Sequence, residues 1–466
     1  MLALSLLAPP LHAAGLHEVG FGVTVADDEY NELRQSVALL ADGSFATVWS
    51  TAGDARLQIL RPDGSKVFSD DGRGVTDSPL PFSNLVVAAN PAGGAFVAFS
   101  GGAPGGTQVF VQSFDADGNP RWQTGGVFAA TPRFGDDQLD TQLAAAPQGG
   151  VYVCLHSFHK IGALGDEMVC QRLSAGGQRL WTDQGVSANG GPDGNFRELP
   201  KVVRDDRNGL MVFWRNNLMG LLTPNEHVQI EGQHLAPDGT RSWGAHGRIV
   251  RTTKLSAGIG YRDISLSAVS DGQGGAIVSF DDGPSLTDSD VFAQRITGDG
   301  RLLWRNGAAV ATGSSYQAND SLTATRDGGA FVTVWQPVAL GDELWLYRLG
   351  PNGKVLWKQR VTSGDPRLAF SDLGAYASFD NGRLRLAWEH YQPVGGRGTD
   401  VYLAVYDLAG HRLNGADGTP LTSAQNAQFL RGFAFDPVRK QGLAVWDDQR
   451  TDNAADFDTR GALYQE

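Results

Sequence analysis

Short segments of alternating apolar and polar residues run along most of this chain, and glycine-containing turns separate them. The stretch 320–359 is representative. Its segments DSLTATR and AFVTVWQ are joined by Asp327-Gly328-Gly329, and LWLYRLG and KVLWKQ are joined by Asn352-Gly353. A period of two places successive side chains on opposite faces of a strand, and Asp-Gly or Asn-Gly supplies the positive φ angles of a tight hairpin. The stretch therefore predicts four antiparallel strands.

This four-strand unit recurs about every 50 to 60 residues, the period of a solenoid or a propeller. Its later turns are RPDG (61–64), DADG (115–118), SAGG (174–177), APDG (236–239), TGDG (297–300), GPNG (350–353) and DLAG (407–410). Its earlier turns contain Gly43, Gly94, Gly150, Gly209, Gly275, Gly329, Gly382 and Gly442. Four antiparallel strands repeated radially form a propeller blade. The sequence predicts an all-β fold, namely an eight-bladed β-propeller of four-stranded antiparallel blades.

The two ends of the chain complement one another in this pattern. The last unit stops after its third strand, whereas the N-terminal stretch GLHEVGFGVTVADDEYNE matches the outer strand and exit loop of other units. We expect the N-terminal strand to complete the last blade, which would leave no free sheet edge. Residues 15–466 are then a single domain. Residues 1–14, MLALSLLAPPLHAA, have the apolar core of a signal peptide without a preceding basic residue, and they predict a truncated export signal.

The net charge and the hydropathy of the chain limit its possible partners and its location. The net charge of −13 argues against nucleic acid, which requires a basic surface. No apolar stretch is long enough for a transmembrane helix. The predicted export signal favours a secreted, periplasmic or cell-envelope location over a cytoplasmic one, and we expect the protein to act as a monomer.

The two cysteines lie in strands on either side of one loop, Cys154 in VYVCL and Cys170 in MVCQR. Neighbouring antiparallel strands can form a disulfide if the register matches, and two buried thiols are the alternative. Neither cysteine belongs to a Cys-x-x-Cys pair, so the spacing does not favour a thiolate metal site.

The segment VWDDQRTDNAADFDTRGALYQ resembles a repeat of secreted bacterial β-propeller proteins, W-x-D-x-R followed by D-I/V-Y-x-Q-R and D-x-x-G-x-x-L-W. Related segments are DVFAQRITGDGRLLW (290–304), EMVCQRLSAGGQRLW (167–181) and DVYLAVYDLAG (400–410). Such proteins are exported and mostly lack an assigned activity, so the resemblance implies no catalytic residue. The turn preceding the tryptophan also resembles the docking repeat of eight-bladed quinoproteins and of envelope assembly propellers. Quinoprotein enzymes of that type carry an adjacent Cys-Cys pair, which is absent here, so we expect no quinone cofactor.

A tryptophan in the predicted fourth strand recurs in five units, at Trp122, Trp181, Trp243, Trp304 and Trp357. Rings at equivalent places in successive blades are expected to fill the space between blade faces.

A second set of aromatic residues occupies the connections between units. The candidates for a ligand-binding aromatic ring are Tyr30, Phe134, Phe196, Tyr261, Tyr316 and Phe370, with Phe82 and Phe429 at the remaining connections. Loops at one end of a propeller share a face around its axis, where aromatic faces suit sugar rings. The alternative is that these rings plug the gaps between blades. A tyrosine hydroxyl needs a polar partner, so the tyrosines are the better candidates for exposure.

Polar residues suggest two further possibilities. The Asp-rich segments 280–290 and 446–458 contain Asp281, Asp282, Asp447 and Asp448, which could bind Ca²⁺ or merely cap turns. His156, His159 and His390 lie near the ends of predicted second strands, where a histidine with Arg and Tyr could serve a polysaccharide lyase. No nucleophile elbow, phosphate loop or zinc-protease motif occurs.

The leading hypothesis is a non-catalytic recognition or scaffolding propeller that binds a glycan or a protein on its loop face. The first alternative is a carbohydrate-active enzyme, either a lyase or a glycoside hydrolase, on the same face. The second alternative is an envelope assembly scaffold. An enzyme requires a histidine or carboxylate that converges with an arginine near the axis, whereas a scaffold requires an apolar patch on the rim.

Overall fold

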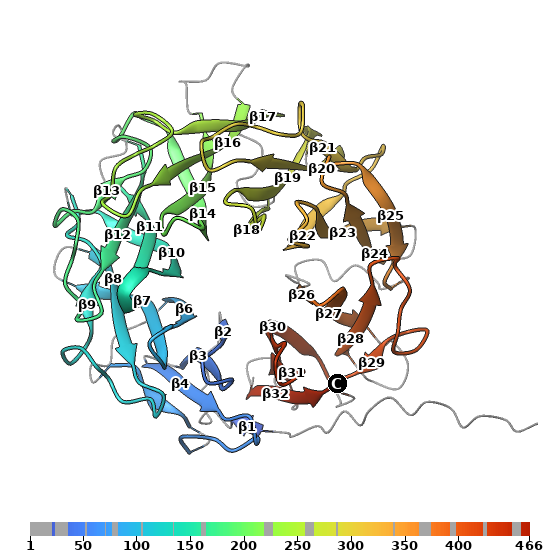
Figure 1. The fold of residues 1–466 in the computed structure, drawn as a ribbon, viewed down its shortest axis with the longest axis horizontal. Coiled ribbons are helices and arrows are strands. Elements are labelled where there is room, and N and C mark those ends of the chain that lie inside the picture. Colours follow the sequence, from blue (N-terminus) through green and yellow to red (C-terminus); the bar gives the residue numbers. More distant parts are fainter. Residues whose placement is uncertain are drawn as a thin grey trace, which may run out of the picture.

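The computed structural model describes residues 21–23, 36–51, 54–69, 71–76, 83–103, 106–133, 135–159, 165–218, 227–256, 265–285, 288–338, 341–362, 374–391, 398–422, 426–449 and 458–466. These residues form eight four-stranded antiparallel sheets arranged as a ring, an eight-bladed β-propeller (Figure 1). The predicted fold class is confirmed. The predicted signal segment 1–14 lies outside the described residues.

Each blade runs from an innermost first strand to an outer fourth strand. Blade 1 contains β2 (Ser36–Leu39), β3 (Phe45–Thr51), β4 (Asp54–Leu60) and β5 (Arg73–Gly74); blade 2 contains β6 (Ser83–Ala89), β7 (Ala95–Ala103), β8 (Gly106–Phe114) and β9 (Val127–Phe128). Blade 3 contains β10 (Asp137–Ala145), β11 (Val151–Phe158), β12 (Glu167–Leu173) and β13 (Val186–Ser187), with a 3-10 turn at Pro147–Gly149; blade 4 contains β14 (Phe196–Arg204), β15 (Leu210–Asn217), β16 (His227–Leu235) and β17 (Arg248–Ser256).

The second half of the ring repeats this order. Blade 5 contains β18 (Leu266–Ser270), β19 (Ala276–Ser285), β20 (Asp288–Ile296) and β21 (Ala308–Ala311); blade 6 contains β22 (Ala318–Ala324), β23 (Ala330–Val338), β24 (Gly341–Leu349) and β25 (Val355–Arg360). Blade 7 contains β26 (Ala375–Asp380), β27 (Arg383–Tyr391), β28 (Thr399–Asp407) and β29 (Thr419–Pro420); blade 8 contains β30 (Gln428–Asp436), β31 (Gln441–Asp448), β32 (Asp458–Gln465) and β1 (Phe21–Val23).

The N-terminal strand completes blade 8, as the sequence predicts. β1 pairs antiparallel with β32, with Phe21 opposite Gly461 and Val23 opposite Thr459. The third strand of the last blade therefore has a partner on both sides, and the ring is closed by its own two ends.

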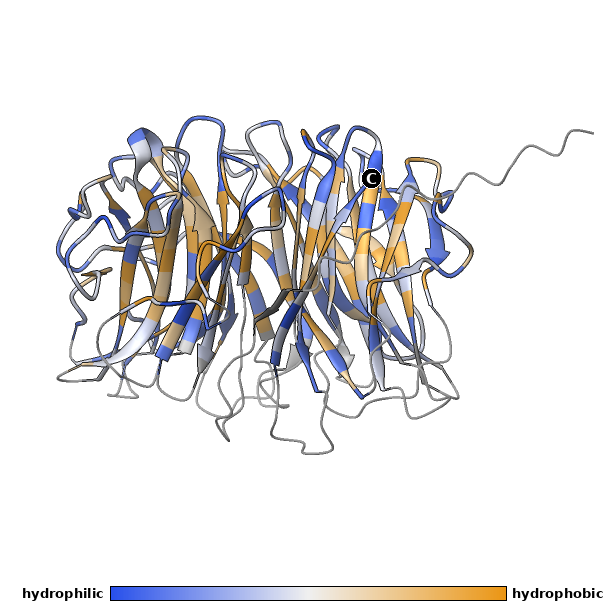
Figure 2. Cartoon of the chain, turned by 90° about the horizontal axis from the view of Figure 1, so that it is seen from below, coloured by the Kyte–Doolittle hydropathy of each residue, from blue (hydrophilic) through white to orange (hydrophobic). Residues whose placement is uncertain are grey.

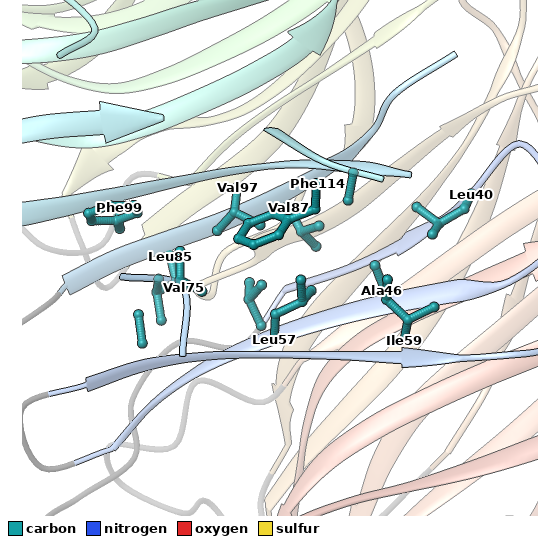
Figure 3. Close-up of a cluster of buried hydrophobic side chains, with 13 residues drawn as sticks. Leu40, Ala46, Leu57, Ile59, Val75, Leu85, Val87, Val97, Phe99 and Phe114 are labelled. Carbon is teal, nitrogen blue, oxygen red and sulfur yellow. The ribbon is translucent and has the colours of Figure 1, made fainter. Parts of the chain in front are cut away.

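The hydrophobic core lies between successive blades rather than at the centre of the ring. Figure 3 shows one such cluster, in which Leu57 and Ile59 of blade 1 pack with Val97, Phe99 and Phe114 of blade 2. Figure 2 shows the hydrophobic residues concentrated within the strands. The second strand of blade 8, β31, is buried at every position, whereas the innermost β2 is only half-buried at every position. Solvent therefore reaches the wall that surrounds the axis.

The recurring tryptophans join blades 2 to 6 each to the following blade, as well as filling the space between them. Each indole Nε1 donates a hydrogen bond to a carbonyl oxygen in the later turn of the following blade. The donors Trp122, Trp181, Trp243, Trp304 and Trp357 reach Ala175, Pro237, Gly298, Pro351 and Leu408 at 2.8–3.1 Å. The ring also lies against the glycine of that turn. At Gly353, for example, an added Cβ would approach Trp304 to 2.8 Å.

Most outer strands begin later than the sequence predicts. Four of the five tryptophans precede the outer strand, and only Trp357 lies within one, β25. A glutamine on the third strand bonds through its side chain to the backbone of the tryptophan that precedes the outer strand. In blade 5, Gln294 accepts a bond from the backbone N–H of Trp304 at 2.9 Å and donates to its carbonyl oxygen at 2.8 Å. Gln112, Gln171 and Gln233 accept the equivalent bond in blades 2 to 4.

Candidate functional site

The loop face is the end of the ring where second strands end, third strands begin and one blade leads into the next; the C-terminus lies at the opposite end (Figure 2). Of the six predicted ring residues, Phe196 and Tyr316 are described and the other four, Tyr30, Phe134, Tyr261 and Phe370, lie outside the described residues. Phe196 begins β14 and Tyr316 lies two residues before β22, and both are half-buried. Both positions are on the loop face. A continuous aromatic ring stays a prediction.

The four aspartates proposed for Ca²⁺ are buried at the loop-face ends of second strands. Asp281 accepts hydrogen bonds from the backbone N–H groups of Asn319 (2.6 Å) and Ser265 (3.0 Å), and so connects blade 5 to the first strand of blade 6. Burial raises the pKa of Asp281 to about 7, although these hydrogen bonds oppose the shift. Glu389 makes the same kind of connection from blade 7 to the backbone N–H of Leu430 at 2.7 Å.

The other three aspartates also have protein partners. Asp282 accepts from Arg251 Nε at 2.8 Å, Asp447 from Arg431 Nε at 2.6 Å, and Asp448 from Gln428 Nε2 at 3.3 Å. Among the described residues, no three His, Cys, Asp or Glu side chains are placed to hold a metal ion together. Ca²⁺ binding stays a prediction.

Five side chains from three consecutive blades gather near the axis, and we call them the axial cluster. Asp320 on β22, Tyr376 on β26 and Arg431 on β30 belong to the innermost strands of blades 6, 7 and 8 (Figure 1). Glu389 on β27 and Asp447 on β31 lie behind them, 1% and 2% exposed. All five lie in the halves of their strands nearest the loop face.

Tyr376 is the exposed member of the axial cluster, with 36% of its side chain accessible. Successive side chains of a strand point to opposite faces of the sheet. Ala375 and Ala377 pack into the core between blades 6 and 7, so Tyr376 points the other way. No described residue makes a hydrogen bond with its hydroxyl group. Arg431 is half-buried and holds Asp447 through Nε, and its Cζ lies 5.7 Å from the ring centroid of Phe429.

Burial raises the pKa of three members of the axial cluster, Tyr376, Asp320 and Glu389. Desolvation raises the pKa of Tyr376 well above the usual value, and the negative charge of Asp320 raises it further while Arg431 opposes it. Desolvation likewise raises the pKa of Asp320 to about 7, against hydrogen bonds from Thr333 Oγ1 (2.9 Å) and the Ala375 N–H (3.4 Å). The pKa of Glu389 also lies well above its usual value, chiefly through burial. The cluster therefore offers a neutral phenol donor and a guanidinium.

Sequence reasoning missed Tyr376 and Arg431, because it searched the connections between blades and both residues lie within first strands. A signal was present in the alternation. The segment AYASFD places a tyrosine on the face opposite two alanines that suit a core position. The sequence around Tyr376 gives no sign that it approaches residues of blades 6 and 8.

The histidines of blade 3 are structural rather than exposed. His159 is buried between two carboxylates, with Nδ1 2.6 Å from Asp136 and Nε2 3.2 Å from Glu167. His156 lies 3.0 Å from Asp166. Burial alone would lower the pKa of His156, but hydrogen bonds and charges from Asp140 and Asp166 outweigh it and raise the pKa to about 9. These groups support the loop face from inside the blade.

Cys154 and Cys170 lie directly opposite one another on β11 and β12, with their Cα atoms 4.0 Å apart, and they form a disulfide. The bond ties together the two strands that carry His156 and Glu167. Among the described residues, no helix is long and apolar enough to cross a membrane.

No protein-family model matches the sequence, and no curated protein matches it. Solved structures resemble this chain at low identity. A puromycin hydrolase is 15% identical, with a TM-score of 0.45. The match covers 92% of this chain but only 60% of that enzyme. An ulvan lyase from a new family of polysaccharide lyases is 9% identical, with a TM-score of 0.47, covering 88% of this chain and 97% of the lyase. A Penicillium chrysogenum alpha-L-arabinanase is 14% identical, with a TM-score of 0.41, covering 68% of this chain and 92% of the arabinanase.

Proposed function

We propose that this protein is a non-catalytic recognition module that binds a glycan at the loop-face end of its axis, with Tyr376 and Arg431 as the principal contacts. One observation carries the proposal: Tyr376 is a partly exposed aromatic ring on the innermost wall, beside an arginine and free of hydrogen bonds to the described residues. A sugar can stack its C–H face on the ring and accept hydrogen bonds from the phenol and the guanidinium.

The protonation states favour binding over chemistry. A tyrosine with a raised pKa stays neutral at physiological pH, so it donates a hydrogen bond but is a weak base. Arg431 already neutralises the charge of Asp447. Both groups can recognise hydroxyl oxygens without removing a proton from the ligand.

Export is part of the proposal. The Cys154–Cys170 disulfide supports it, since disulfides persist in oxidising compartments. The apolar segment 1–14 and the resemblance to secreted repeat proteins point the same way.

A glycan-array screen of the purified protein tests the proposal, with and without Ca²⁺. Tyr376→Ala should weaken the identified interaction by about tenfold or more, as loss of a central aromatic contact does. Phe128→Ala is the matched control, because Phe128 is 38% exposed on the outer strand β9. A blank array, or equal losses in both variants, would refute a glycan site at the axis.

A carbohydrate-active enzyme at the same site is the second candidate, and the convergence of an arginine with Asp320 and Glu389 favours it. Asp320, with a pKa of about 7, could accept a proton near neutrality. Incubating the bound glycan with the protein and measuring new reducing ends or unsaturated products decides between the two. Turnover that Asp320→Asn abolishes while binding persists would establish the enzyme.

An assembly scaffold has one supporting observation as well. Exposed leucines recur near the outer edge of blades 3, 5, 6 and 7, at Leu180, Leu302, Leu356 and Leu413, with 38% to 59% of each side chain accessible. Protein cross-linking through this edge, together with a blank glycan array, would favour the scaffold.

A further inference from the structure

A groove beside the outer edge of blade 6 has the features of a second ligand site; it shares β27 with the axial cluster, since Glu389 lies between its wall residues Trp388 and His390. It lies between blades 6 and 7 and has a volume of about 700 Å³, within the range of small-molecule sites. Its wall includes Arg360 and Thr362 at the outer edge of blade 6, and Trp388, Tyr402 and Arg412 from blade 7. We propose that this groove binds the carboxylate group of an acidic saccharide.

The first support is a buried, unsatisfied donor on a residue that lines the groove. Trp388 is 1% exposed, and its indole N–H has no hydrogen-bond partner among the described residues. A buried polar group without a partner costs about 1–3 kcal/mol, so an acceptor at this point would be favourable. The indole ring lies against Gly418, where an added Cβ would approach it to 2.6 Å, and this contact fixes its position.

Blade 4 contains the same arrangement with its acceptor present. Trp214 occupies the equivalent position on its second strand, and its Nε1 donates to Glu231 Oε2 at 2.9 Å. Asn216, two residues later, donates to the other oxygen of the same carboxylate at 2.9 Å. The protein itself therefore shows that a carboxylate fits beside this tryptophan.

Blade 7 keeps the tryptophan and has a tyrosine in place of the carboxylate residue. Tyr402 stands opposite Trp388 in the strand register, as Glu231 stands opposite Trp214. His390, two residues after Trp388, occupies the position of Asn216, and its Nδ1 lies 2.8 Å from Thr362 Oγ1. A ligand carboxylate in the groove would replace the missing side-chain carboxylate.

The groove also carries a positive charge without a counter-ion. Arg412 makes hydrogen bonds only to neutral groups, the hydroxyl of Tyr406 (2.7 Å) and the carbonyl oxygens of Val361 (2.9 Å) and Ala416, and it forms no ion pair with the described residues. Arg360 is paired with Glu343 at 3.1 Å, and Asp417 lies on the rim. In a protein of net charge −13, this unpaired arginine is a local attraction for an anion.

The remaining wall favours a saccharide over a peptide side chain. Tyr402 is half-buried and presents an aromatic surface, and Gln359, Thr362 and Asp417 supply side-chain hydrogen-bonding groups. A sugar acid offers one carboxylate together with several hydroxyl groups, which matches one unpaired cation and a polar wall.

Calorimetric titration of the full-length protein tests this site, with trigalacturonate as the probe. Its methyl ester should bind about tenfold to one hundredfold more weakly, because the ester removes the charge-assisted bonds. Trp388→Phe removes the N–H and keeps an aromatic ring, and it should weaken binding by about fivefold to tenfold. Trp446→Phe is the matched control: Trp446 is 1% exposed, its N–H also lacks a described partner, and it does not line the groove.

A second variant fills the site from within. Tyr402→Glu places a carboxylate at the register position that Glu231 holds in blade 4, so it should abolish trigalacturonate binding in a protein that remains folded by circular dichroism. Tyr376→Ala should leave this binding unchanged, which separates the groove from the axial site. Any of four results would overturn the proposal. The first two are no binding of trigalacturonate and equal affinity for its methyl ester. The other two are equal affinity for an acetylated triglutamate peptide and equal effects of Trp388→Phe and Trp446→Phe.

Discussion

The docking of a tryptophan on the turn of the next blade can be measured with two glycine substitutions. Gly353 and Gly382 both follow asparagine in a tight turn, and their φ angles are +77° and +76°. An added Cβ at Gly353 would lie 2.8 Å from Trp304 and 3.0 Å from Ala308, whereas at Gly382 the nearest atom is Leu408 Cδ1 at 4.0 Å. Alanine at the two positions therefore differs mainly in the contact with Trp304.

The expected costs follow from that difference. Both variants hold alanine in the left-handed region, which costs about 1–2 kcal/mol. Gly353→Ala must also move the ring of Trp304, which is 3% exposed, by roughly half an ångström, and overpacking of this kind costs about 1–3 kcal/mol. We expect Gly353→Ala to destabilise the protein by about 1–3 kcal/mol more than Gly382→Ala.

Urea unfolding followed by tryptophan fluorescence gives both values. A double-mutant cycle supplies the control, since the extra cost of Gly353→Ala should vanish when Trp304→Leu has already removed the ring. Equal free energies of unfolding for the two alanine variants would show that the docked tryptophan can yield without loss, and would refute the account of how blades are joined.

Three other perturbations have defined outcomes. Asp320 has a pKa of about 7 and His156 a pKa of about 9, so each binds a proton more tightly in the folded protein than in the unfolded chain. The free energy of unfolding should therefore fall as pH rises. The fall lies between about pH 4 and 7 for Asp320 and between about pH 6.5 and 9 for His156. A urea midpoint that increases from pH 5.5 to 9 would contradict this. Cys154→Ala should cost up to about 3 kcal/mol, the value for a closed loop near 16 residues, and added reductant should then have no further effect on the unfolding midpoint. Deletion of residues 1–23 should leave the β32 edge unpaired and promote aggregation, measured by light scattering. Deletion of residues 1–14 should not. Identical behaviour of the two truncations would argue against closure by β1.

The fold is predictable from the sequence because its signals are local and repeated. Alternation defines the strands, and Asn-Gly or Asp-Gly defines the hairpins, so the eight blades and the role of the N-terminal strand follow from counting. The start of most outer strands differs from the prediction, because four tryptophans precede these strands. Their start depends on glutamine side chains such as Gln294, which bond to the backbone from another strand, and alternation carries no trace of that contact.

The candidate sites were only partly predictable. The sequence places Phe196 and Tyr316 at the loop face, and the structure agrees with that placement. Tyr376 and Arg431 are 55 residues apart and come together through the angle between two blades, which no spacing in the sequence expresses. Asp281 was considered as a metal ligand from its acidic neighbours, whereas in the structure it accepts backbone hydrogen bonds from blade 6.

Closure of the ring by β1 and β32 also constrains how the chain can be made. The paired residues Phe21 and Gly461 are 440 positions apart, so β1 leaves the ribosome long before its partner β32. Bringing such distant ends together in an unfolded chain would cost about 5 kcal/mol of loop entropy. Blades 1 to 7 contain all their own strands and can form as synthesis proceeds, and their curvature then holds the two ends near each other. Closure of the ring is therefore expected late, once β32 has been made and can pair with β1.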